Sequence, residues 1–309
     1  MAETPVTSTC LSEALPLDPH RSLRVRFGML LGEDDFVTLT AYPRGKQWLH
    51  SAWLHRHGVV WGLGVELDTR SREVRVRPGL ALDPLGRELC LDTLSCVDLG
   101  AWFDAHREDP AFSVEDLGAG RVRFTAHVTV RFRACLDRQV PAMAEPCAGD
   151  ARTTSYSRLV ETVTLTLHPG PAPAPEPPPA PYPRLRLLYG LRAPRLDEDG
   201  NPVPADQEVL DTVAALPGSA DPPAAAQAAF RRFAALDVTE MAPATASEAL
   251  TRFPGAEPGE VLLAEVREIV LAGGTGAWTL ESGTVDVTVR PAHVATTTLQ
   301  DLLAASAVP

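Results

Sequence analysis

Residues 122–132 read Val-Arg-Phe-Thr-Ala-His-Val-Thr-Val-Arg-Phe, with an apolar side chain at every second position. This period of two predicts a long β-strand with one face in a core and the other face polar. A second alternating run, residues 160–167, predicts its neighbouring strand. Between them, residues 134–159 are expected to form a long loop that contains Cys135 and Cys147, a length that usually serves binding.

Upstream of this strand, the pattern predicts a short strand and then a helix. Residues 23–27 alternate apolar and basic side chains. The acidic run at residues 33–35 suits a helix start, because negative charge is favourable at the positive end of the helix dipole. Apolar spacing predicts a helix from residue 35 to about 57, which Pro43 and Gly45 are expected to kink or divide.

Short strands and a tight hairpin are expected next. Residues 59–67 and 73–77 predict strands, the latter with one apolar face and one arginine-bearing face. Residues 79–82 and 88–91 predict a hairpin. The sequence Asp-Pro-Leu-Gly at 83–86 is typical of a type I turn between them.

A proline-rich segment at residues 169–183 reads PGPAPAPEPPPAPYP, with nine prolines in fifteen positions. Proline fixes φ and lacks an N–H, so we expect an extended polyproline-II spacer of about 45 Å. A peptide ligand for an SH3-like groove is the alternative. Beyond it, strands are expected at 185–191, 260–270 and 284–289, and helices at 205–215 and 222–236.

The predicted fold class is therefore mainly β with a few helices (α+β), arranged as two β-rich units joined by the Pro-rich linker. The expected parts are an N-terminal tail (1–22), an N-terminal β-rich docking unit with one helix (23–168), the linker (169–183) and a C-terminal α+β unit (184–309).

Composition limits the classes of partner. The chain has 28 Lys and Arg against 40 Asp and Glu, a formal net charge of −12. Such a chain repels phosphate backbones and anionic membrane surfaces, so neither nucleic acid nor membrane insertion is expected. The first twenty residues lack the pattern of a secretion signal, and the five cysteines are odd in number and scattered. We expect a soluble protein with reduced thiols that is cytoplasmic and assembled into a particle.

Signatures of catalysis are missing from the sequence. It contains no nucleophile elbow, Walker loop, HExxH or CxxC motif, and the glycine-rich run at residues 273–276 fits a hairpin turn better than a phosphate-binding loop. The sequence therefore predicts a protein that is not an enzyme, with no catalytic residues and no cofactor.

Two groups of residues contain the side-chain types that bind metal ions. His50, His55 and His57 lie on one predicted helix, but the i+5 position points away from the other two, so the three do not converge. Cys135 and Cys147 with His127 or His168 match no common zinc-site spacing, and plain thiols explain them better. No metal site is predicted, and helix electrostatics accounts for the acidic run at 33–35.

Exposed aromatic, histidine and arginine side chains are the candidates for contacts with other proteins, because aromatic residues and arginine are enriched where interfaces bind tightly. These interface candidates are Trp48, Trp53, His50, His55, Trp61, Arg75 and Arg77.

Three segments carry a resemblance. They read LRVRFGMLLGEDDF followed by WLHSAWLHRHGVVWGLGVEL within residues 23–67, PGLALDPLGRELCLD at 78–92, and ACLDRQVPAMAEPCAGDARTTSYSRLVE at 134–161. Together they resemble uncharacterised structural proteins, baseplate or tail-associated, encoded with phage-tail-like extracellular contractile injection systems. The chain departs from that pattern at Trp61, where the family has a small residue or cysteine, and at Pro43 and Gly45, which interrupt the helix.

The resemblance implies a structural or assembly component, a baseplate or tail-end accessory subunit that acts by protein–protein contacts. Its implied partners are other subunits of the particle and further copies of itself. A carbohydrate- or cell-surface-binding module is the first alternative, since β-rich units with exposed tryptophans often bind sugars. A metal-dependent hydrolase is the second.

Overall fold

A computed structural model describes residues 9–10, 15–55, 57–110, 112–141, 154–173, 182–240 and 259–294. The fold is β-rich, with 38% of residues in strands and 30% in helices. The chain forms two compact units, Met1–Pro173 with Phe253–Pro309, and Ala174–Arg252. No helix in the described ranges has the length and apolar character needed to cross a bilayer.

The elements of the first unit are β1 (Thr9–Cys10), α1 (Glu33–His50), the π-helix η1 (Ser51–His55), β2 (Gly58–Gly62), β3 (Val65–Asp68), β4 (Glu73–Val76), β5 (Gly79–Leu82), β6 (Glu88–Leu91), β7 (Ser95–Asp98), α2 (Leu99–His106), β8 (Val114–Gly118), β9 (Arg121–Pro141), β10 (Thr154–Pro169), β11 (Val261–Ala272) and β12 (Thr279–Asp286).

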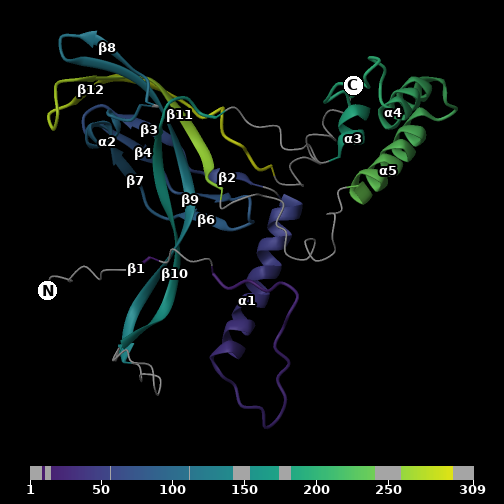
Figure 1. Cartoon of the computed structure of the whole chain (residues 1–309), viewed down its shortest axis with the longest axis horizontal. Helices are drawn as coiled ribbons and strands as arrows, with labels where there is room; N and C mark the ends of the chain where they lie inside the picture. Colours follow the sequence, from purple (N-terminus) through teal and green to yellow (C-terminus); the bar gives the residue numbers. More distant parts are fainter. Residues whose placement is uncertain are drawn as a thin grey trace. The chain divides into compact units, whose positions relative to one another are not determined.

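The strand predicted at residues 122–132 is confirmed as part of β9, the central strand of the largest sheet (Figure 1). β9 pairs antiparallel with β10. The register runs from Ala126 opposite Pro169 at one end to Pro141 opposite Thr154 at the other. The expected loop at 134–159 is therefore wrong over most of its length, because both strands continue as a ribbon; residues 142–153, with Cys147, lie outside the described residues.

The C-terminal strands also belong to this sheet. β11 pairs with β9 and with β12, and the GGTG run lies in the turn between β11 and β12. This differs from the expected C-terminal unit at 184–309. The sequence pattern at 260–270 predicts a strand, but it contains no information about which strand lies next to it. Residues 174–181 of the Pro-rich segment lie outside the described residues.

Two three-stranded sheets complete the first unit, β2-β5-β6 and β3-β4-β7. The hairpin predicted at 79–91 is confirmed as β5 and β6, and Gly86 N–H donates to Asp83 C=O at 2.9 Å in its turn. The single strand expected at 59–67 is wrong. Gly62 and Leu63 have positive φ, so the chain turns there and β2 and β3 enter different sheets.

All three sheets share one core. It includes Val59, Val74, Leu89, Val128 and Leu263, each less than 5% exposed. The aromatic residues of α2 close one side of it, and Trp102 Nε1 donates to Leu167 C=O at 2.8 Å. These contacts make the three sheets one body that can carry α1.

The predicted helix is confirmed as α1 and η1, but Pro43 does not divide it. A Cβ at Gly45 would lie 2.8 Å from Pro19 N, so the preceding segment packs directly on the helix at this point. The strand expected at 23–27 is wrong, because no described strand pairs with it and residues 24–27 are exposed.

α1 is fixed to the rest of the unit through the β5–β6 turn. A Cβ at Gly86 would lie 2.0 Å from Trp48 C=O, so only glycine fits there. The Arg87 guanidinium pairs with the buried Asp83 carboxylate at 2.6 Å and lies over the Phe132 ring. Trp48 packs edge-on against Phe132, with ring centroids 5.7 Å apart. We call this contact the α1 joint.

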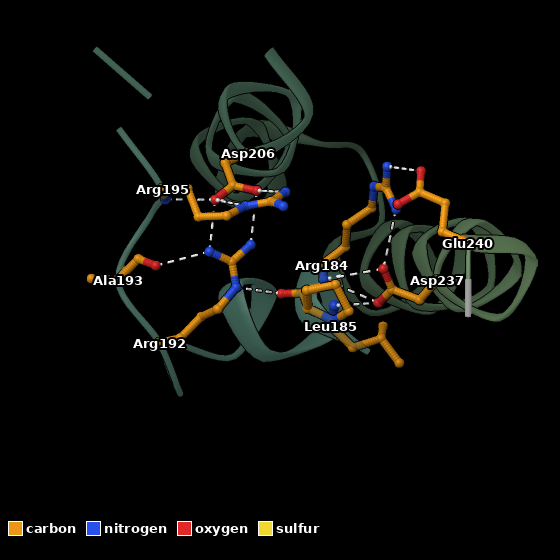
Figure 2. A network of polar contacts seen from close by, with 9 residues as sticks. Arg184, Leu185, Arg192, Ala193, Arg195, Asp206, Asp237 and Glu240 are labelled. Atoms are coloured by element: carbon orange, nitrogen blue, oxygen red, sulfur yellow. Dashed lines mark hydrogen bonds and ion pairs between the residues drawn. The ribbon is translucent and has the colours of Figure 1, made fainter. Parts of the chain in front are cut away.

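The second unit contains, in its described residues, α3 (Pro183–Leu188), α4 (Pro204–Ala215), the short 3₁₀-helix η2 (Leu216–Gly218) and α5 (Pro222–Glu240). The helices predicted at 205–215 and 222–236 are confirmed. The strand expected at 185–191 is wrong, because the Asp237 carboxylate accepts hydrogen bonds from the Arg184 and Leu185 N–H groups and so caps a helix there (Figure 2). The unit is helical in the described part, not β-rich.

Its small core of Leu187, Val209, Ala229 and Phe233 is supported by buried ion pairs. Asp206 is fully buried and lies between Arg192 and Arg195 (Figure 2). The hydrogen bonds from Arg192 hold the pKa of the Asp206 carboxyl well below its usual value of 3.8. A unit with so small an apolar core depends strongly on such pairs.

We predict that Gly86→Ala lowers the free energy of unfolding by about 3 kcal/mol, since the new methyl both clashes with α1 and sits at positive φ. Gly118→Ala is the matched control. Gly118 has φ of +75° but open space around its Cβ position, so only about 1 kcal/mol should be lost. Urea unfolding of both variants measures the difference, and equal losses would contradict the close contact.

We also predict that Asp206→Asn destabilises the second unit by about 3 kcal/mol at neutral pH, because Arg192 is left without its counter-ion. A depressed pKa in the folded state gives stability that is present above about pH 4 and lost as the pH falls further. The wild-type unit should therefore weaken below pH 4, and the variant should weaken less. Native-state hydrogen exchange of α4 is the measurement, with the exposed Asp211→Asn as control; an unchanged exchange rate in Asp206→Asn would show that the pair is dispensable.

Candidate protein-interaction surface

α1 has two distinct faces. Ala41, Gly45, Trp48 and Ala52 are buried and recur at helical spacing, so they form the face that packs on the unit. The opposite side of the helix has no cover from the described residues. We call this side the outer face of α1; its residues are Phe36, Leu39, Thr40, Pro43, Lys46 and His50.

The outer face is apolar near the start of the helix. Phe36 is 54% exposed and Leu39 is 51% exposed. A surface helix normally turns such side chains toward the core, but here the core side is already occupied by Trp48 and Ala41. Two large apolar side chains of α1 are therefore left uncovered by the described part of the chain.

The segment before α1 extends this apolar surface. We call residues 23–32 the apical loop; in Figure 1 the purple segment passes alongside α1 and turns back into its first residue. The turn is closed by a hydrogen bond from Met29 N–H to Arg26 C=O at 3.2 Å. Phe27 is fully exposed and Leu30 is 93% exposed. Contiguous apolar surface of this kind on a folded protein marks an interaction site.

A shallow groove of about 690 Å³ lies along the later half of the same helix. Described residues that line it are Pro43, Lys46, Gln47, Leu49, His50 and Trp53. The surface thus combines protruding apolar side chains at one end of α1 with a concave region toward the other end.

Charge is also unevenly distributed along α1. Glu33 and Asp34 are exposed at its start, and Lys46 and His50 are exposed on its later turns. Within the described residues, none of Glu33, Asp34 and Lys46 forms an ion pair. These charges are available to a partner.

The predicted tryptophans are placed differently from one another. Trp48 is buried in the α1 joint, so it stabilises the fold and does not reach the surface. Trp53 is partly buried and lines the groove, and Trp61 on β2 is 56% exposed. Among the three, Trp53 and Trp61 are accessible to a ligand or partner.

The predicted histidines His50 and His55 are brought together with a third that the sequence does not suggest. The His55 ring lies edge-on to His50 at 5.3 Å and to His293 at 5.6 Å. His293 reaches them because its segment pairs with β2, where Val59 N–H donates to Pro291 C=O at 2.8 Å. The described residues contain no group of three side chains arranged to hold a metal ion.

Arg75 and Arg77 form ion pairs with carboxylates of β3, and Arg75 also pairs with Glu73 of its own strand β4. Arg75 contacts Asp68 at 2.7 Å and Glu73 at 2.9 Å, and Arg77 contacts Glu66 at 2.7 Å. The Glu73 carboxylate raises the pKa of Arg75 through its hydrogen bond. Arg75 is therefore largely compensated within the sheet, while Arg77 and Glu66 stay exposed.

His127 and His168 face each other across β9 and β10, with stacked rings 5.0 Å apart. His168 Nε2 contacts the Glu260 carboxylate at 2.6 Å, and burial lowers the pKa of His127. Cys135 lies eight residues further along β9, roughly 27 Å away. Cys135 therefore does not lie close enough to these histidines to share a metal ion with them.

Cys135 is disulfide-bonded, which contradicts the expectation of reduced thiols. β1 places Cys10 opposite Cys135 in the backbone register of β9. This backbone pairing joins positions that are 125 residues apart, so the spacing of the cysteines in the sequence does not indicate it. Cys90 and Cys96 are free and exposed.

Sequence reasoning did not select Phe27, Leu30, Phe36 or Leu39 as surface residues. The alternation at 23–27 was enough to predict a strand with a buried face, and Phe36 and Leu39 fit a helix that packs on the core. The high density of large apolar residues over positions 23–39 is the sequence signal that points to an interface.

No protein-family model matches the chain, and a search of curated proteins gives no match.

We predict opposite effects for the two faces of α1. Trp48→Ala should lower the free energy of unfolding by about 3–5 kcal/mol, because it opens a cavity in the α1 joint. Phe36→Ser should change it by less than about 0.5 kcal/mol, because the side chain is exposed. Urea unfolding compares them, and a loss for Phe36→Ser similar to that for Trp48→Ala would place Phe36 in the core instead.

Proposed function

We propose that this chain is a structural component of a phage-tail-like contractile injection particle, a baseplate or tail-end accessory subunit that acts by protein–protein contacts. It assembles in the cytoplasm and needs no cofactor. The apolar surface of the apical loop and the outer face of α1 is the observation that carries the proposal. Phe27 and Leu30 are exposed almost completely, and a partner protein would remove them from water.

The architecture supports this role. α1 is held by the α1 joint on a body of three sheets with a single core, so its outer face is presented by a rigid support. Interfaces built on rigid supports lose less conformational entropy on binding than flexible ones. The motifs at residues 23–67 and 78–92, which carry the resemblance, are the segments that form α1, η1, β2, β5 and β6.

A second contact surface is the edge of β10. Among described strands, β10 pairs with β9 alone, so the other edge of a sixteen-residue strand has no strand partner there. Open strand edges pair readily with strands from other chains. We further propose that the Pro-rich segment at 169–183 is a spacer between the two units, with its first residue at the end of β10 and its last at the start of α3.

A carbohydrate-binding module is the second candidate, and the exposure of Trp61 favours it, since sugars stack on exposed indole rings. An immobilised glycan array tests it. Binding that is lost on Trp61→Ala would support this candidate, and the absence of binding to all glycans would remove it.

The test of the main proposal is affinity purification of the tagged full chain from its native host after mild lysis. Mass spectrometry and negative-stain imaging of the eluate should show sheath, tube and baseplate proteins with tail-like particles. The double variant Phe27→Ser, Phe36→Ser should be recovered folded but with particle proteins reduced at least about tenfold, because two interface anchors are gone.

The double variant Leu94→Ser, Leu191→Ser is a matched control, because both side chains are exposed and both lie outside α1 and the apical loop. It should retain more of the particle proteins than the first variant. Recovery of a wild-type chain without any sheath, tube or baseplate protein would contradict the proposal.

A further inference from the structure

We propose that His127 is a proton-operated latch. In its neutral form it holds the chain just after β10 against the large sheet, and its protonation releases that chain. The latched stretch is residues 170–173, which we call the exit segment, because the second unit begins directly after it at Ala174. This inference goes beyond the proposed particle role and does not depend on it.

The exit segment crosses the face of the large sheet that is turned away from the core. Phe124 and Val128 of β9 point into the core, so His127, at an alternate position, points to the other face. The exit segment begins beside β10, and its Ala172 N–H donates to Glu265 Oε2 of β11 at 3.1 Å. β9 lies between β10 and β11, so the segment passes over β9 at His127.

Two hydrogen bonds fix Gly170 at the start of this crossing. Its N–H donates to Thr125 C=O at 2.9 Å. Its carbonyl oxygen lies 3.1 Å from His127 Nδ1, and because a carbonyl accepts and does not donate, Nδ1 carries a hydrogen. The neutral ring therefore has its hydrogen on Nδ1 and none on Nε2. Protonation leaves this hydrogen bond possible, so release must come from the cost of the new charge.

A second imidazole faces His127 on β10. The ring of His168 lies opposite it, stacked with the centroids 5.0 Å apart. His168 Nε2 donates to the Glu260 carboxylate at 2.6 Å, and the Thr129 hydroxyl donates to the same oxygen. Arg131 on β9 adds a further cation near Glu260. The charge of Glu260 is thus already shared among other groups.

The carboxylate that faces His127 from β11 is also paired. Glu265 lies opposite His127 and contacts Arg267 at 2.6 Å, and Arg267 in turn contacts Asp286 of β12 at 2.9 Å. Among the described residues, a proton on His127 therefore finds no carboxylate of its own, and it places a positive charge beside His168.

The direction of the pH dependence follows from these surroundings. Burial lowers the pKa of His127; the hydrogen bond to Gly170 opposes this, and His168 adds to the lowering. The released ring binds a proton more tightly, with the ordinary pKa of about 6.5. The latch is therefore stable above about pH 6.5 and weakens as the pH falls below it. Burial raises the pKa of Glu260, but hydrogen bonds from Thr129 and His168 bring it below its usual value, so Glu260 stays ionised in this range.

Release changes the length of chain that joins the two units. Four further residues become free, which adds about 13 Å of extended chain to the connection. A mildly acidic medium therefore increases the distance over which the second unit can reach, while the large sheet keeps its own pairing.

The test is hydrogen exchange of the isotopically labelled full chain, followed by NMR at pH 7.5 and pH 5.5. The rates are corrected for the effect of pH on an unstructured amide. We expect the amides of Gly170 and Ala172 to lose protection about tenfold, because one pH unit below 6.5 favours the protonated, released ring by that factor. In His127→Gln the loss should be less than about twofold, because the glutamine amide can still donate to Gly170 C=O but does not titrate.

His106→Gln is the matched control. His106 is also partly buried, and its Nδ1 also contacts a carbonyl oxygen, that of Trp102 at 2.7 Å, but α2 packs on the core side of the sheet. This variant should keep the tenfold loss. Protection that is unchanged in the wild type, or that is lost equally in His127→Gln, would overturn the latch.

NMR titration of the His127 ring in the wild type decides the question even if the glutamine variant does not fold. The ring resonances should shift over the same pH range in which Gly170 and Ala172 lose protection. A ring that stays neutral while these amides are released, or that takes up a proton while they stay protected, would also overturn the latch.

Discussion

The contact between Gly86 and the backbone of α1 at Trp48 is the constraint on which the presentation of the surface depends. A hydrogen atom is all that fits between the β5–β6 turn and the helix, so the two backbones meet directly. The Asp83–Arg87 pair holds the turn, and Arg87 in turn lies over Phe132 of β9. The turn, helix and central strand are therefore fixed together, and this decides which side of α1 faces outward.

β9 is the strand on which the largest sheet is assembled. Strands from four parts of the chain pair with it, including β11, which follows the second unit in sequence. The chain leaves the sheet after β10 and returns at β11, and the His168–Glu260 contact joins these two points. The second unit is thus an insertion in the first, stabilised internally by its own buried aspartates. The surface on α1 and the inserted unit belong to separate compact parts of the chain.

Local features of the fold could be predicted where one segment contains the information. The alternation at 122–132, the Asp-Pro-Leu-Gly turn and the acidic start of α1 each reflect the geometry of a few consecutive residues. Long-range pairing could not be predicted in this way. Nothing in residues 260–270 specifies β9 as the neighbour, and the Cys135 disulfide and the contact of His293 with His55 depend on chain segments that meet only after folding.

For the same reason, only part of the interaction surface could be predicted from the sequence. Trp53 and His50 were candidates that lie on or beside this surface, but the sequence alone cannot distinguish a buried aromatic side chain from an exposed one. Trp48 is buried because Gly86 and Phe132 pack against it. Phe36, twelve positions earlier, is exposed because none of the described segments covers it. The same helix pattern therefore supplies both the core contact and the surface that remains available.

Site-specific photocrosslinking in the native host tests the central claim most directly. A photoreactive phenylalanine derivative at position 36, compared with one at the exposed position Leu94, reports which protein covers the outer face of α1. We expect discrete adducts at position 36 only, identified by mass spectrometry as a second copy of this chain or as particle subunits. Position 36 yielding no protein adduct, or the same diffuse background as position 94, would contradict the claim that this face is a protein contact surface.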